Sequence, residues 1–193
     1  MKLLLSSIAC DPYGGSEGIY GWYVVSALAK EYDCFVITGG DSMPSLHRAQ
    51  QEGLIPTNLN FRFLGQPKQY HPNRLIARFQ SWSRFFMFTK SLLPCARSWH
   101  AEEGFDLVQH ITYTTWRVAS PLWKLGIPFI WGPLSGTELF PSSCHNTLSL
   151  SSRCFEIIRS IQSFLARKSP AIRACAQSAS CIPVPHHQAQ SFI

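Results

Sequence analysis

Three short segments of the chain combine small, polar and charged residues in a way that could hold an anionic ligand. They are 11–17 (Asp-Pro-Tyr-Gly-Gly-Ser-Glu), 110–117, which runs from His110 to Arg117, and 131–138 (Trp-Gly-Pro-Leu-Ser-Gly-Thr-Glu). Glycines let the backbone approach a ligand closely, and a helix that starts after such a loop offers N–H groups to phosphate or carboxylate. Histidine can hydrogen-bond a sugar or take a proton, and arginine can clamp an anion with its forked donors.

Each of these segments also has a purely structural interpretation. The first could be only a turn that caps a helix, and a lone histidine is more often structural than catalytic. The loop at 11–17 does not follow the Gly-x-Gly-x-x-Gly pattern, and no Gly-Lys-Ser/Thr follows it. A dinucleotide cofactor and a P-loop are therefore disfavoured.

The elements that must position these segments alternate between short apolar runs and longer helical stretches. The pattern predicts strands at 2–8, 34–38, 61–64, 105–109 and 128–131, with a return to the sheet at 181–184. It predicts helices at 16–30 (capped by Ser16), 72–100 (one helix or a pair), 115–125 and 148–168, the last broken by Pro170. This alternation predicts an α/β fold with a single Rossmann-like, doubly wound parallel sheet. We expect one domain over 1–180 and an irregular tail over 181–193, either cut short or frayed.

The amino-acid composition indicates which kinds of ligand the chain could bind and where in the cell it is expected. The 193 residues are 46% hydrophobic and 15% charged, which excludes a disordered tail, and the net charge of +6 suits anionic ligands. The seven scattered cysteines lack zinc-site spacing, so we expect thiols in a reducing compartment and no metal. Without a membrane span or signal peptide in the pattern, a cytoplasmic location is expected. No recognition motif supports nucleic-acid binding.

The segment 73–97 is rich in aromatic and basic residues. At 100° steps one narrow stripe collects its apolar side chains, among arginines at 74, 78 and 84: Leu75, Phe79, Trp82, Phe86 and Leu93. We expect this stripe to face the core, because packing requires an apolar face. The alternative is a peripheral contact with the inner, anionic face of a membrane.

The order of the motifs resembles the amino-terminal half of a bacterial family 4 glycosyltransferase of the GT-B type. The resemblance covers residues 2 to about 179 and rests on five segments in order: Gly14-Gly15-Ser16-Glu17, Asp106-Leu107-Val108-Gln109-His110, Trp116-Arg117, 126–133 (Gly-Ile-Pro-Phe-Ile-Trp-Gly-Pro) and Glu138. It implies an enzyme with two Rossmann-like halves, in which the amino-terminal half receives the acceptor and the other half grips a nucleotide-sugar donor. Transfer would retain the anomeric configuration and need neither cofactor nor metal.

The resemblance also implies roles for individual residues. His110 would face the transferred sugar as the catalytic residue, orienting it rather than attacking it. The donor phosphates or the acceptor would contact Gly14, Gly15, Ser16, Glu17, Arg117, Gly136 and Glu138. Ser135 and Thr137 replace two glycines of the family's loop, which narrows the room for a ligand. Because the donor domain is missing from this sequence, we expect the chain alone to transfer no sugar.

Two other function classes stay open. One is a noncatalytic α/β domain that binds a phosphorylated ligand or an anionic membrane surface. A dinucleotide oxidoreductase is a distant third, disfavoured by the absent glycine pattern. The sugar-enzyme hypothesis requires that Gly15, His110 and Gly136 become neighbours along a single rim of the folded sheet, where they would share a common pocket.

Overall fold

The computed structural model describes residues 1–67, 71–136, 140 and 147–184, and within them it forms a five-stranded sheet. The strands are β1 (Lys2–Ser7), β2 (Asp33–Gly39), β3 (Leu59–Leu64), β4 (Leu107–His110) and β5 (Phe129–Trp131). All neighbours pair in parallel, in the order β3-β2-β1-β4-β5. The predicted α/β class with one Rossmann-like parallel sheet is confirmed.

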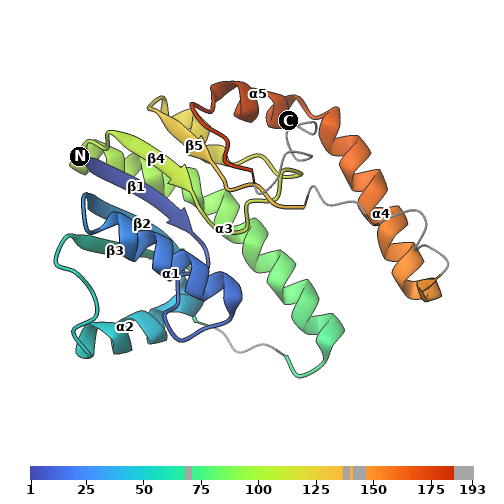
Figure 1. Cartoon of the computed structure of the whole chain (residues 1–193), viewed down its shortest axis with the longest axis horizontal. Coiled ribbons are helices and arrows are strands. Elements are labelled where there is room, and N and C mark those ends of the chain that lie inside the picture. The colour runs from blue at the N-terminus through green and yellow to red at the C-terminus, as the bar shows by residue number, and fades with distance from the viewer. Residues whose placement is uncertain (68–70, 137–139, 141–146, 185–193) are drawn as a thin grey trace.

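Helices cover both faces of this sheet (Figure 1). They are α1 (Ser16–Leu28), α2 (Met43–Gln51), α3 (Arg74–Glu103), α4 (Leu150–Arg167) and α5 (Pro170–Ser178), with short 3-10 turns η1 (Gly40–Ser42) and η2 (Pro121–Leu125). Alternation along β1 sends Leu4 into a core shared with α3, η2 and α5, while Leu3 and Leu5 enter a second core under α1 and α2. The strands are apolar on both sides because both faces are covered.

Several predicted element boundaries are wrong. Ser16 is the first residue of α1 rather than its cap; Gly15 holds the cap position, with no side-chain hydrogen bond. The predicted helix at 115–125 is reduced to η2, because Ser120 caps a 3-10 turn that begins at Pro121. Nothing in the sequence pattern indicated α2, whose second residue is Pro44.

Two prolines, Pro94 and Pro170, lie within helices although proline has no backbone N–H to donate. The segment predicted as one helix or a pair is a single helix, α3, which continues through Pro94. Pro170 does not merely stop α4: it is the first residue of α5, where a missing N–H costs nothing. Cys181 returns beside β5 through one parallel bridge to Ile130, and residues 185–193 of the predicted tail lie outside the described residues.

The aromatic stripe of α3 does not face the core, so that expectation is wrong. Phe79, Trp82 and Phe86 are 76%, 57% and 70% exposed. Among the α3 side chains that the structure describes, the buried ones are instead Phe88, Leu92, Ala96 and Trp99, from the middle of the helix onward. Figure 1 shows why: the amino-terminal half of α3 runs past the edge of the sheet, where no strand lies beneath it.

Of the helices within the described residues, none combines the length and the apolar character needed to cross a bilayer.

Candidate ligand pocket at the carboxyl edge of the sheet

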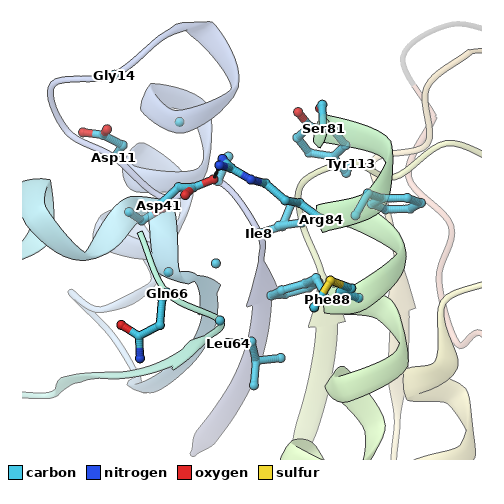
Figure 2. Close-up of a pocket in the computed structure, with 18 of the residues that line it drawn as sticks. Ile8, Asp11, Gly14, Asp41, Leu64, Gln66, Ser81, Arg84, Phe88 and Tyr113 are labelled. Carbon is cyan, nitrogen blue, oxygen red and sulfur yellow. Dashed lines mark hydrogen bonds and ion pairs between the residues drawn. The ribbon is translucent and has the colours of Figure 1, made fainter. Parts of the chain in front are cut away.

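A pocket of about 330 Å³ opens where β1, β2 and β3 end. Its walls come from the loop between β1 and α1, from Gly39–Ser42, from residues 64–66 and from the middle of α3, with Tyr113 after β4 closing one side (Figure 2). The chain order reverses between β1 and β4, because β2 and β3 extend the sheet one way and β4 and β5 the other. Ligands of open α/β sheets bind outside the carboxyl ends of strands at such a reversal.

Glycines at the strand ends keep this part of the pocket free of side chains. A Cβ on Gly40 would lie 2.4 Å from the carbonyl oxygen of Gly65, and one on Gly39 would lie 2.7 Å from that of Ile8. Both distances are shorter than any real contact of a Cβ atom, so backbone packs directly on backbone here. Close backbone packing therefore requires glycine at both positions, and both glycines line the pocket.

The start of α1 lines the pocket next to Gly39 and Gly40, which we call the glycine floor. Gly15 caps the helix in an extended backbone conformation, and a Cβ there would meet no atom within 4 Å. Gly14 is tighter, because a Cβ would come within 2.8 Å of the Asp11 carboxylate. No side chain caps this helix start, so the first N–H groups of α1 and their partial positive charge lie beside the pocket.

Arg84 spans the pocket from α3 toward the end of β2. Its Nη1 forms an ion pair with Oδ2 of Asp41, and the two side chains are 19% and 39% exposed (Figure 2). The pair places a guanidinium, the group best suited to a carboxylate or phosphate, within the lining of the pocket.

Tyr113 joins the loop after β4 to this same site. Its backbone has φ 56°, a region uncommon for residues with a side chain, and its N–H donates to Oε1 of Glu17 at 2.7 Å. The ring stacks on Phe85 with centroids 5.8 Å apart. Glu17 therefore acts as a link between α1 and the loop after β4, rather than as part of the pocket lining.

His110 ends β4 and is buried beneath the sheet edge. Its Nδ1 lies 3.2 Å from the Ser120 hydroxyl, its ring hydrogen-bonds the backbone of Thr112, and its side chain is absent from the pocket lining. Burial lowers the pKa of the imidazole from 6.5 to about 4, and the Thr112 bond opposes that shift only in part. At neutral pH His110 is an uncharged imidazole that ties β4 to η2; its catalytic role stays a prediction.

Arg117 and Gly136 are brought together, but outside the pocket. Nη1 of Arg117 and Nε1 of Trp116 donate to the carbonyl oxygen of Gly136 at 2.7 and 2.9 Å. Main-chain bonds add to this link, since Ser135 N–H donates to Thr114 at 2.9 Å. These contacts fasten the loop after β5 to the loop after β4.

The three predicted loops do leave the same edge of the sheet. The register pairs Ser6 with His110 and His110 with Trp131, so β1, β4 and β5 end side by side. Of the predicted site residues that the structure describes, only Gly14 and Gly15 line the pocket, so Gly15, His110 and Gly136 do not share a common pocket. Ser16 is exposed next to them, and Glu138 lies outside the described residues.

Sequence reasoning missed much of the pocket. Gly39-Gly40-Asp41 follows a strand just as Gly14-Gly15 does, and that repeated pattern could have marked it. No sequence pattern indicated that Arg84 belongs to the pocket, because it is 43 residues away from Asp41 in the sequence and meets it only in the fold.

No group of three or more histidine, cysteine, aspartate or glutamate side chains that could hold a metal ion occurs in the part of the chain that the structure describes. Comparison of the chain with models of known protein families and with curated proteins finds no match.

Proposed function

We propose that this domain is the acceptor-side half of a retaining glycosyltransferase of the GT-B type. The pocket would receive the acceptor beside the phosphates of a nucleotide-sugar donor. The observation that carries the proposal is the pocket itself, which joins a glycine floor, the uncapped start of α1 and the guanidinium of Arg84 at the carboxyl edge of the sheet. The motif order described above supports the same assignment.

The chemistry of sugar transfer suits this lining. The bond between the anomeric carbon and the diphosphate oxygen breaks, and negative charge grows on the departing diphosphate. The oxygen of the acceptor hydroxyl bonds to the anomeric carbon, and the hydroxyl proton passes to the departing diphosphate. Fixed N–H groups at a helix start and a guanidinium stabilise such charge as it appears. Arg84 and the first turn of α1 are the groups placed to do so from this half.

The resemblance assigns the donor to a second Rossmann-like half, whereas β1 to β5, the strands of the described residues, form a single sheet that Cys181 joins by one bridge. We therefore expect the chain alone to transfer no sugar from UDP-glucose, UDP-N-acetylglucosamine or GDP-mannose. Turnover by the isolated chain with any of these donors would contradict the division of roles.

Binding can be tested without turnover. Titration with glucose 1-phosphate to millimolar concentration, where weak ligands are seen, should shift the amide NMR signals of Gly15 and Gly40 but not that of Gly126, which lies beyond η2. The Gly15→Leu variant should abolish the shift of Gly40, because its side chain enters open space beside the pocket without backbone strain. Ala27→Leu, an exposed change on the same helix, is the matched control.

The noncatalytic alternative makes a different prediction in the same titration. A domain that only binds phosphorylated ligands would give equal shifts with inorganic pyrophosphate and with glucose 1-phosphate, whereas an acceptor site should also respond to the sugar. Absence of any shift at Gly15 and Gly40 with all probes would remove both candidates for this pocket.

A further inference from the structure

The helix α4 turns its apolar side outward. At 100° steps an arc of about 120° contains seven residues, Leu150, Cys154, Ile157, Ile158, Ile161, Phe164 and Leu165, which we call the α4 apolar face. Its six large side chains are between 50% and 80% exposed, and Cys154 is exposed as well. Ala166, on the opposite side of the helix, is buried in the main core. Among the described residues Lys168 lies over the Phe164 ring, and every large side chain of the face keeps at least half of its surface exposed.

A helix face of this size is too costly to leave in water without a partner. Single exposed apolar residues are normal, but a contiguous patch of large ones marks an interaction site. The position of α4 fits that interpretation, because it stands apart from the sheet and reaches past it on the same side as the amino-terminal half of α3 (Figure 1). That half of α3 adds the exposed Trp82 and Phe86.

The side chains around the α4 apolar face are mostly basic, which favours an anionic partner. Segment 150–168 carries Arg153, Arg159, Arg167 and Lys168 against the single acid Glu156, and Arg159 lies 3.0 Å from Glu156. The chain as a whole has a net charge of +6. Arg153 borders the α4 apolar face and Arg159 lies opposite it, whereas Lys168 lies over the Phe164 ring, 4.4 Å from its centroid. A helix with a face of Phe, Leu and Ile and with cationic residues around it is typical of helices that lie in the surface of an anionic bilayer.

The charge of the segment argues against a second copy of the chain as the occupant. Two copies that packed their α4 apolar faces together would bring two segments side by side, each with four basic residues and one acidic residue, and like charges repel. An anionic bilayer instead offers opposite charge to the same basic residues.

We propose that α4 is a membrane-docking helix, whose apolar face inserts into the interface of an anionic lipid bilayer. The helix lies parallel to the bilayer, with Ile157, Ile161 and Phe164 among the acyl chains and the arginines at the lipid phosphates. This inference does not depend on the proposed function, since no residue of the α4 apolar face lines the pocket.

The full chain is tested with vesicles of phosphatidylcholine alone or mixed with phosphatidylglycerol. We expect sedimentation with the anionic vesicles, weakened by added salt, and little with the neutral ones. The Ile157→Ser, Ile161→Ser double variant should bind at least roughly tenfold more weakly, with unchanged circular dichroism because both positions are in solvent. Tyr23→Ser, at a 68% exposed position of α1, is the matched control and should bind normally.

Two exposed cysteines give a readout at the level of single residues. Cys154 belongs to the α4 apolar face and Cys181 lies near β5, so anionic vesicles should slow alkylation of Cys154 and leave that of Cys181 unchanged. Peptide mass mapping distinguishes the two sites. Protection of Cys154 that grows with protein concentration in the absence of vesicles would identify a second copy as the occupant and overturn the proposal. Equal binding to neutral and anionic vesicles, equal loss in Tyr23→Ser, or no binding at all would also overturn it.

Discussion

Arg84, in the middle of α3, forms an ion pair with Asp41, which lies in η1 two residues after the end of β2. This contact joins the long helix to the sheet edge by opposite charges within the lining of the pocket. Because Asp41 neutralises part of the positive charge that an anionic ligand would meet, the pair sets both the stability of this wall and its attraction for anions.

The two partners of this ion pair should have opposite effects on anion binding. Arg84→Gln should weaken binding of glucose 1-phosphate, whereas Asp41→Asn should strengthen it, because the first removes positive charge and the second removes negative charge. Either change should cost less than about 1 kcal/mol of unfolding free energy, since the pair is partly exposed. Isothermal titration and urea unfolding measure the two quantities. Equal weakening by both variants would mean that the pair only shapes the wall.

The glycine floor should tolerate no added methyl group. Gly40→Ala should lower the free energy of unfolding by roughly 1–3 kcal/mol, because its Cβ would lie 2.4 Å from the backbone oxygen of Gly65. Gly15→Ala serves as the control, with open space around the added atom and an extended backbone, and should change stability by no more than about 0.5 kcal/mol. Urea unfolding of both variants decides this; equal stability would contradict the close packing of β2 and β3.

The two sides of α3 should differ sharply in their energetic importance. Phe88→Ala should cost roughly 3–5 kcal/mol, because the ring is 5% exposed and its removal leaves a cavity in the main core. Phe86→Ala, at 70% exposure, should cost no more than about 0.5 kcal/mol. Thermal unfolding followed by circular dichroism compares them. A large loss in the Phe86 variant would restore the expectation that the aromatic stripe packs inward.

Burial of His110 should make the fold sensitive to mild acid. The unfolded chain takes up a proton on this imidazole near pH 6.5, but the folded chain does so only near pH 4. The stabilisation is therefore complete above pH 6.5 and is lost as the pH falls from 6.5 to 4, by about 3 kcal/mol in total.

Urea unfolding as a function of pH checks this, with His110→Gln expected to flatten the profile in that window. His47→Gln, at an exposed position of α2, is the matched control for the loss of an imidazole. If the His110 variant is too unstable for comparison, direct NMR titration of the His110 ring in the unaltered chain answers the question. A midpoint near pH 6.5 would refute the prediction.

The sequence determined the strands and the class of the fold. Apolar runs such as Leu3–Leu5 and Cys34–Ile37 are buried on both faces, a local pattern that persists whatever packs on them. A second local pattern identified the loop with Gly14 and Gly15 after β1, because pairs of glycines are typical of turns and loops.

Tertiary structure alone decided which residues share the pocket and which side of a helix is covered. Arg84 meets Asp41, and Gly40 meets Gly65, across sequence separations that no local pattern encodes. Periodicity predicted an apolar stripe on α3, but not that Phe86 of this stripe lies in water. The periodicity of a helix shows which residues share a face. Whether that face is buried depends on where the sheet ends, and this is decided by the packing of the whole chain.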